Sequence, residues 1–315
     1  MDVTYPYDRE LYSRLFLNCS QRQSLVMLAE REPLAYQLLH RCMVSTDEIL
    51  RQIVREQRPK YSFESGLLHR DDLANIGIVA EESAFGTYAE ARGLLLDVVA
   101  QEGYAILVGD VFYWPHCPEY TNQHLMHTIV LKGYDEDTAR WSLVDDNPAS
   151  LLCAYAYPEE VIAAGFDNSE LRRVRYFTAK EFDASQAAAA ARRTFAGQLD
   201  RYEDGLTLFS GVGELIACPW IAPERVVFLL HDAFSLYQGS RAGLLEYVRR
   251  ALDDARAEEL LTSIVRQSTD VRNQLLLGKV TGSLDAGRTA AACLGLKEAE
   301  EELLPRLRAA AGERA

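Results

Sequence analysis

Residues 126–135 read MHTIVLKGYD and residues 141–148 read WSLVDDNP, and these two segments decide how the chain is interpreted. Both are rich in strand-forming side chains, so we expect two consecutive strands. The polar residues 135–138 between them are typical of a solvated hairpin turn. His127 then starts the first strand and Asp145 ends the second. A histidine and a carboxylate in these places can supply a proton acceptor and the group that orients it.

A cysteine far upstream, Cys19, has the setting of a nucleophile. It follows the apolar stretch 15–18 and begins a helix that we expect over Cys19 to Arg31. Only the thiolate is a good nucleophile, and a helix N-terminus and a nearby imidazolium both favour it. With His127 as the base and Asp145 orienting the imidazole, the three groups meet the needs of nucleophilic catalysis. A buried structural cysteine is the alternative for Cys19.

The other patterns in the first half of the chain indicate helices followed by antiparallel strands. A helical stretch is expected at 34–43, and capping boxes at 45–48 and 87–90 predict two further helix starts. Gly103 is well placed to end the last of these helices. Because helices precede strands instead of alternating with them, we predict an α+β fold. The strands are expected at 104–114, 126–134, 139–145 and 171–177.

Beyond Ser185 the hydrophobic periodicity is helical. We therefore predict two domains, an α+β catalytic domain over 1–185 and a helical domain over 186–315. The helices of the second domain are expected at 185–204, 222–238, 241–267, 268–280 and 284–311.

Composition and charge limit the classes of partner and compartment. The 315 residues are 48% hydrophobic, which suffices for one large core or two moderate ones. A net charge of −14 argues against binding to nucleic acid or an anionic membrane, because both need clustered Lys and Arg. We expect no transmembrane helix, since no run of about 18 apolar residues occurs. We also expect no signal peptide, since residues 1–6 lack the basic and apolar regions of one. Six scattered cysteines without CxxC spacing favour reduced thiols and hence a cytoplasmic protein.

Three short motifs carry a resemblance to a known superfamily. The segment Asn18-Cys19-Ser20-Gln21, the strand 127–135 and the ending 143–148 together resemble the papain-like C39 peptidase superfamily. The chain is most similar to its non-proteolytic branch, the butirosin-biosynthesis acyltransferase family. The resemblance covers roughly residues 10–150, and the helical remainder is compatible with the family's longer members. It implies a papain-like (C39-like) fold with an additional C-terminal helical domain.

The resemblance also implies an activity and a role for each residue. Members of the family take an acyl or aminoacyl group from the phosphopantetheine thioester of an acyl or peptidyl carrier protein. They pass it to an amine on a small acceptor, and the resemblance implies no cofactor bound by the chain itself. Cys19 is then the acyl-accepting nucleophile, His127 the general base and acid, and Asp145 the third member of the triad. Asp146 is the fallback, because a slip of one residue in a strand exchanges its faces.

The sequence also offers candidates for substrate-binding positions. Papain-like enzymes commonly place a Gln a few residues before the cysteine as an oxyanion donor, but Tyr12-Ser13-Arg14 contains none. Asn18, or the backbone N–H of Cys19 with a further donor, can take that role. Tyr113 and Trp114 are candidates for lining the substrate channel, with a place in the core as the alternative.

The histidines around residue 120 raise the question of a metal. His116, Cys117, His124 and His127 follow the spacing H-C-x6-H-x2-H, which fits no standard zinc signature. We therefore predict no metal site. The loop that carries these residues is expected to border the substrate channel.

Two other functions are compatible with the same residues. A cysteine hydrolase, either a peptidase or an amidase, would use water or a peptide in place of the carrier protein and amine. A non-catalytic binding module would keep the fold, and Cys19 would be an unactivated buried thiol. Carrier proteins are usually acidic, so 172–175 and 249–250, which contain clustered arginines, are candidates for docking one. The alternative for these arginines is an ordinary solvated surface.

Overall fold

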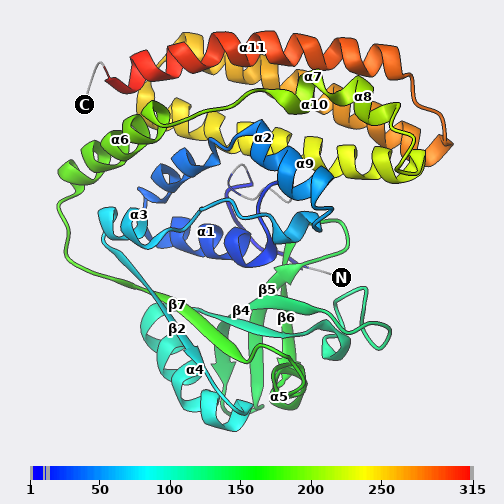
Figure 1. The fold of residues 1–315 in the computed structure, drawn as a ribbon. Coiled ribbons are helices and arrows are strands. Elements are labelled where there is room, and N and C mark those ends of the chain that lie inside the picture. The colour runs from blue at the N-terminus through cyan, green and yellow to red at the C-terminus, as the bar shows by residue number, and fades with distance from the viewer. Residues whose placement is uncertain (1–2, 10, 12–14, 313–315) are drawn as a thin grey trace. The chain divides into compact units, whose positions relative to one another are not determined.

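The computed structural model describes residues 3–9, 11 and 15–312 (Figure 1). The chain groups into two compact units. The predicted domains at 1–185 and 186–315 are contiguous, whereas segments 13–18 and 34–69 group with the C-terminal helices and not with the sheet. The sheet unit is drawn from residues 1–12, 19–33 and 70–182, and the helical unit from residues 13–18, 34–69 and 183–315.

The sheet unit is built on a seven-stranded sheet in which every described pairing is antiparallel. Its strand order is β1-β6-β5-β4-β3-β7-β2. The antiparallel sheet and the helical C-terminal region confirm the predicted mixture of helices and antiparallel strands. The strands are β1 Val3–Thr4, β2 Ile78–Ala84, β3 Ala105–Asp110, β4 Met126–Asp135, β5 Arg140–Asp146, β6 Leu152–Pro158 and β7 Arg173–Ala179.

Three of these strands, the two-residue β1 together with β2 and β6, have no counterpart among the predicted ones. β2 carries two glutamates and a serine, and all but its first residue are half-buried or exposed, so its sequence lacks the apolar alternation of a buried strand. It lies at one end of the strand order, where only one neighbour is needed. β6 ends at Pro158 and runs directly into the helix α5, Glu159–Asp167, which obscures its pattern.

One face of the sheet carries α5 and α4, Tyr88–Glu102 (Figure 1). As predicted, the Thr87 hydroxyl caps α4 by accepting the N–H of Glu90, and Gly103 ends the helix with a φ of 73°. The core beneath these helices contains the buried side chains of Leu95, Trp114, Ile129, Leu131, Trp141, Leu143 and Phe166.

The opposite face of the sheet carries α1, Cys19–Arg31, the helix predicted from Cys19. Side chains alternate between the two faces of a strand. On β4, Ile129 lies in the core under α4 and α5, whereas Lys132 reaches α1 and bonds Glu30 at 3.0 Å. The same alternation separates Asp145 from Asp146 at the end of β5. α3, Arg70–Asn75, is a further, shorter helix of this unit.

The second unit consists of helices. Three long helices dominate it, and Gly239 lies inside the first of them, where the sequence pattern predicted a break. That prediction was wrong because the missing side chain marks a close contact: a Cβ on Gly239 would lie 2.7 Å from the backbone N of Phe16. The predicted break at 267–268 is also absent, since the hydroxyls of Ser268 and Thr269 bond the carbonyl of Val265 within the helix. The long helices are α9 Pro223–Tyr247, α10 Ala255–Thr281 and α11 Ala286–Gly312.

Shorter helices fill the rest of the helical unit. The predicted helix at 34–43 is a 3-10 helix, Ala35–Cys42, and the sequence that follows Ser45 continues from α2, Thr46–Ile49, into a π-helical stretch, Leu50–Arg55. No helix in the described part of the chain is long and apolar enough to cross a membrane. The remaining short elements are the 3-10 helix Lys60–Ser62, α6 Ala184–Asp200, α7 Thr207–Ser210, α8 Val212–Ile216 and the π-helical stretch Val248–Leu252.

Candidate active site

Cys19 is the first residue of α1 and its side chain is partly buried. Burial by itself would raise the pKa of the thiol. The positive charge of His127, a hydrogen bond with that imidazole and the charge of Arg22 overcome burial and lower the pKa of Cys19 to about 6. Its position at the helix N-terminus favours the same anion. Cys19 is therefore a thiolate at neutral pH.

His127 is the second residue of β4, and its Nε2 lies 2.9 Å and 3.0 Å from the two carboxylate oxygens of Asp145. Nδ1 is the ring nitrogen left for the thiol. Burial alone would lower the pKa of His127, but the charges of Asp145 and Cys19 and their hydrogen bonds raise it to about 10. The thiolate and the imidazolium therefore coexist as an ion pair between about pH 6 and pH 10.

Asp145 forms hydrogen bonds with several side chains of the site, and only 1% of its own side chain is exposed. Burial would raise the pKa of its carboxyl, but His127 and His116 hold the pKa well below its usual range. Its Oδ1 also accepts the backbone N–H of Asp146 at 2.7 Å. A buried carboxylate with this many donors stays ionised and keeps one orientation.

Strand alternation decides between the two neighbouring carboxylates. Val130 pairs with Val144, so β4 and β5 are direct neighbours at this end of the sheet. His127 continues the row of Ile129, and Asp145 continues the row of Leu143 on the same face. Asp146 points to the other face, where its Oδ2 lies 3.1 Å from the Arg22 guanidinium of α1. The geometry therefore brings Asp145, and not the fallback Asp146, to the imidazole.

Two hydrogen-bond partners of Asp145, Gln23 and His116, were not predicted from the sequence. Gln23 donates from Nε2 to Asp145 Oδ1 at 2.9 Å and to the Thr128 carbonyl at 2.7 Å. His116 lies 2.8 Å from Asp145 Oδ2 through its own Nε2. Gln23 stands one helical turn after Cys19, but Gln21, Arg22 and Ser24 beside it are polar as well, so no pattern in α1 singles it out. No pattern in the sequence links His116 to Asp145, because the contact is tertiary.

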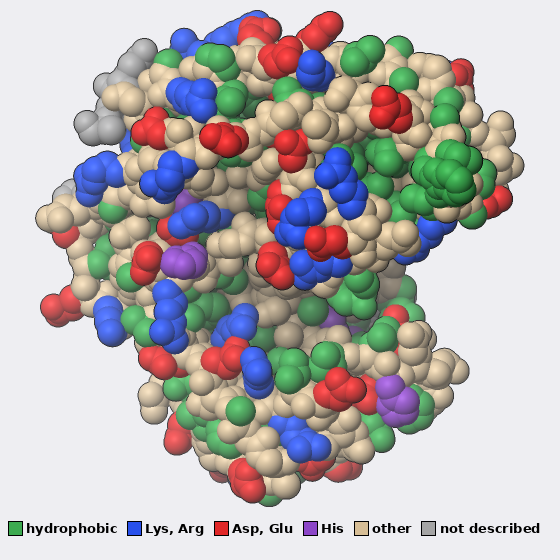
Figure 2. All heavy atoms as spheres, in the orientation of Figure 1, with side chains coloured by type: hydrophobic (Ala, Val, Ile, Leu, Met, Phe, Trp, Pro, Cys, Tyr) green, Lys and Arg blue, Asp and Glu red, His purple; other side chains and the backbone are tan. Residues whose placement is uncertain are grey.

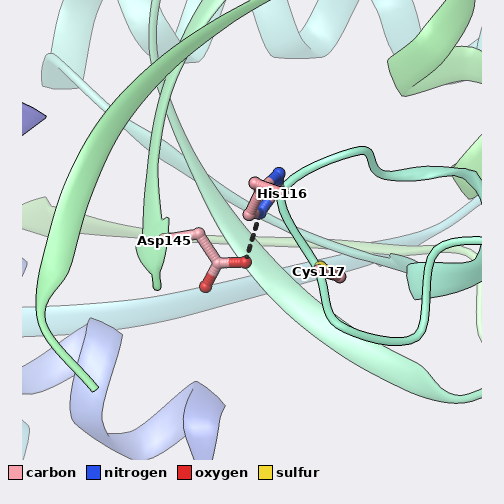
Figure 3. A group of neighbouring side chains, drawn as sticks. All are labelled: His116, Cys117 and Asp145. Atoms are coloured by element: carbon pink, nitrogen blue, oxygen red, sulfur yellow. Dashed lines mark hydrogen bonds and ion pairs between the residues drawn. The ribbon is translucent and has the colours of Figure 1, made fainter. Parts of the chain in front are cut away.

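A second cysteine lies beside the same carboxylate (Figure 3). Ligand atoms of His116, Cys117 and Asp145 lie within 4.8 Å of one another. Burial and the negative charge of Asp145 raise the pKa of the Cys117 thiol far above its usual range, so it stays protonated. In Figure 3 the nitrogen of His116 that faces Asp145 is already engaged in their hydrogen bond. The prediction that no metal binds stays a prediction.

The predicted substrate-binding residues have mixed environments. Trp114 is wholly buried in the core, and its ring centroid lies 6.4 Å from that of His127, so it packs behind the imidazole. Tyr113 is half-buried, with its ring against Phe112. Asn18 is half-buried and directly precedes the thiol in sequence. The segment Tyr12-Ser13-Arg14, where an upstream oxyanion donor was sought, lies outside the described residues. Substrate binding by Tyr113, Trp114 and Asn18 stays a prediction.

Comparison with known proteins adds one relative. No family model matches the chain. Over 135 residues the chain is 27% identical to the ribostamycin:4-(γ-L-glutamylamino)-(S)-2-hydroxybutanoyl-[BtrI acyl-carrier protein] 4-(γ-L-glutamylamino)-(S)-2-hydroxybutanoate transferase of Niallia circulans. The match covers 42% of this chain and 45% of the relative, so it spans less than half the length of that enzyme. The chain is thus similar over this stretch to a transferase that acts on a carrier-bound acyl group, which confirms the predicted resemblance to the butirosin-biosynthesis acyltransferases.

Proposed function

We propose that this chain is a cysteine-dependent acyltransferase of natural-product biosynthesis. It moves an acyl or aminoacyl group from the phosphopantetheine thioester of a carrier protein to an amine on a small acceptor. The observation that carries the proposal is the buried, hydrogen-bonded arrangement of Cys19, His127 and Asp145. The similarity to a transferase named for a carrier-bound substrate supports the thioester as the electrophile.

The arrangement also supports a papain-like fold for the sheet unit. A helix begins at the nucleophile, and the base and its carboxylate come from neighbouring antiparallel strands. His127 bonds the carboxylate through Nε2, so its Nδ1 remains for the thiol at the start of the helix. In this proposal the sheet unit supplies the chemistry.

In the first half-reaction the Cys19 thiolate attacks the thioester carbonyl carbon. A new C–S bond forms and the carbonyl oxygen becomes an oxyanion. Collapse of this intermediate breaks the C–S bond to phosphopantetheine, and the departing thiolate takes the proton of the His127 imidazolium. The products are the acyl-Cys19 thioester, a free phosphopantetheine thiol and a neutral His127.

In the second half-reaction the acceptor amine attacks the acyl-Cys19 carbonyl. Neutral His127 accepts one proton from the amine nitrogen, and the amide forms as the C–S bond to Cys19 breaks. Cys19 leaves as a thiolate, which restores the ion pair with imidazolium. Asp145 stays ionised throughout and stabilises the imidazolium without taking its proton.

The oxyanion needs donors close to the thiol. The first N–H groups of a helix have no partner within the helix, and the N–H of Cys19 is one of these in α1. Such N–H groups can bind the oxyanion with the aid of the helix dipole. We propose Asn18 as the side chain that supplies the second donor.

The proposed partners are a carrier protein and a small amine, and neither nucleic acid nor a membrane. Of the predicted docking residues, Arg173 and Arg175 both pair with Glu82, at 2.9 Å and 2.7 Å, and Arg175 also donates to the Ser20 hydroxyl next to Cys19. Basic and acidic side chains are mixed over the face seen in Figure 2. We expect a cytoplasmic protein, because all six cysteines are free thiols.

A cysteine hydrolase would use the same triad, with water in place of the amine. The two activities differ in the fate of the acyl-Cys19 thioester. A non-catalytic module is disfavoured by the lowered pKa of Cys19, since an unused buried thiol has a raised pKa, as Cys117 does.

The test is to supply an acyl-loaded carrier protein without an acceptor and to measure the intact mass of the enzyme. We expect a single acyl adduct that maps to Cys19 and is absent from Cys19→Ala. Addition of an amine should then discharge the adduct as an amide. A free acid formed at the same rate with and without amine would support hydrolysis, and an adduct retained by Cys19→Ala would overturn the proposal.

A further inference from the structure

Gln23 is a buried polar side chain of the site that the mechanism leaves unused. Gln23 is 1% exposed and lies four residues after Cys19 in α1, so both residues are on one face of the helix. Its Nε2 makes two hydrogen bonds, one to Asp145 Oδ1 at 2.9 Å and one to the backbone carbonyl of Thr128 at 2.7 Å. Both partners are acceptors, so the amide has one orientation, with nitrogen toward the sheet.

The two acceptors belong to the two strands that carry the rest of the triad. Thr128 directly follows His127 on β4, and Asp145 is the triad carboxylate on β5. Gln23 is therefore a polar link between the helix of the nucleophile and the strands of the base. Leu25, Val26 and Leu28 on the same helix are buried apolar side chains, which offer packing but no directional bond. The distance between Cys19 and His127 depends on how α1 sits over β4.

We propose that Gln23 is a positioning residue that fixes the Cys19 helix against the His127–Asp145 pair through its two donated hydrogen bonds. This inference rests on the proposed function, because it assigns Gln23 to the same triad. Gln23 touches no reacting atom. Its effect passes through Asp145, whose carboxylate it orients, and through the β4 backbone beside His127.

The chemical consequence is a change in the thiolate itself. The thiolate of Cys19 depends on the closeness of the imidazolium, and Coulomb attraction falls with distance. A looser helix therefore returns the thiol toward the behaviour of a free cysteine, which is only a few per cent ionised at pH 7. Loss of a structural contact elsewhere in the protein would not move this property.

The experiment measures the rate of Cys19 alkylation by iodoacetamide as a function of pH in Gln23→Met, which keeps the length of the side chain and removes both donors. We expect the midpoint of the profile to move up by about two pH units and the rate at pH 7 to fall about tenfold. At a pH well above 9 the rates of the variant and the wild type should converge. kcat for acyl transfer at pH 7 should fall with the alkylation rate.

A matched control is Gln52→Met in the helical unit. Gln52 is also 1% exposed and also makes two hydrogen bonds, to Glu48 and to the N–H of Glu64. We expect it to cost stability and to leave the pH profile of Cys19 unchanged. If Gln23→Met does not fold, Gln23→Asn takes its place, because the shorter amide cannot reach both acceptors.

The outcomes separate the two proposals. A folded Gln23 variant with the wild-type alkylation profile overturns the positioning role and leaves the acyltransferase proposal standing. A wild-type profile with its midpoint near 8.5, the ordinary value of a free cysteine, overturns the proposed function on which the inference rests. A profile shifted equally by Gln52→Met overturns the positioning role as well.

Discussion

A buried cluster of charges lies in each unit of the chain, around Glu300 in the helical unit and around Asp145 in the sheet unit. The two clusters differ in whether their hydrogen bonds lead to a solvent-accessible group. In the helical unit, Arg241 binds Glu300 through two nitrogens at 2.6 Å and 3.2 Å, with 0% and 3% of their side chains exposed. Tyr237 donates to the same carboxylate at 2.6 Å, and the Val44 carbonyl accepts from Arg241. This cluster joins α9 to α11 and presents no charge to solvent.

The cluster at Asp145 in the sheet unit is open at one end. Its carboxylate is as buried as Glu300, but the chain of hydrogen bonds leads to His127, which is 19% exposed and faces a partly buried thiol. The last group of this chain of hydrogen bonds is the partly buried thiol of Cys19 and not a saturated ion pair. Burial and pairing therefore do not by themselves mark a functional site. We expect a buried charge network to mark one when it ends at a reactive, accessible atom.

The largest effect that the comparison predicts is the loss of chemistry at the open cluster. Cys19→Ala should lower acyl transfer by about 10⁴-fold or more, because the covalent intermediate cannot form. The free energy of unfolding should change by less than about 1 kcal/mol, since the side chain is only partly buried. The measurements are single-turnover transfer and thermal unfolding. Cys218→Ala, a cysteine of similar exposure in the helical unit, is the control and should keep full activity.

The second prediction concerns the closed cluster. Glu300→Gln preserves the shape of the side chain but leaves the Arg241 charge buried without its counter-ion, which should cost about 3–5 kcal/mol of stability. The alkylation profile of Cys19 should stay the same. Chemical denaturation gives the stability, and Glu302→Gln on the same helix, whose partner Arg256 is exposed, should cost about 0.5 kcal/mol or less. An equal loss of stability in both variants would contradict the expected difference between the buried and the exposed ion pair.

The two clusters also differ in how far their residues could be predicted from the sequence. Cys19, His127 and Asp145 could be predicted as a site because each stands at the end of a helix or strand, where periodicity stops and a polar residue stands out. Asp145 and Asp146 are adjacent and could be separated only once the Val130–Val144 pairing fixed the faces of β5. The pairing of Arg241 with Glu300 left no local signal, because it joins residues far apart in sequence through helix packing. Gln23 and His116 were invisible as partners of Asp145 for the same reason.

The third prediction concerns how the reactivity of Cys19 in the Asp145 cluster depends on pH. The pKa of Cys19 is lowered to about 6, so the reactive thiolate is present above that pH and is lost as the pH falls through it. The alkylation rate should rise about tenfold between pH 5 and pH 7 and level off, instead of rising through 8.5 as for a free cysteine. Acyl transfer should decline again near pH 10, where His127 loses the proton that the leaving thiolate needs. A rate that still climbs between pH 7 and pH 9 would contradict the ion pair.

The smallest predicted effect concerns the second imidazole at the open cluster. His116 stacks on Tyr155 and Tyr157, with ring centroids 4.4 Å and 5.6 Å apart, and holds Asp145 Oδ2 at 2.8 Å. His116→Phe keeps the stacked ring and removes only this hydrogen bond. Asp145 retains its bonds to His127 and Gln23, so kcat should fall between about threefold and tenfold, which corresponds to roughly 1 kcal/mol. Steady-state kinetics and thermal unfolding check this prediction. A variant that loses stability but keeps kcat would show that His116 has a structural role, as the Arg241–Glu300 pair has, and does not support the triad.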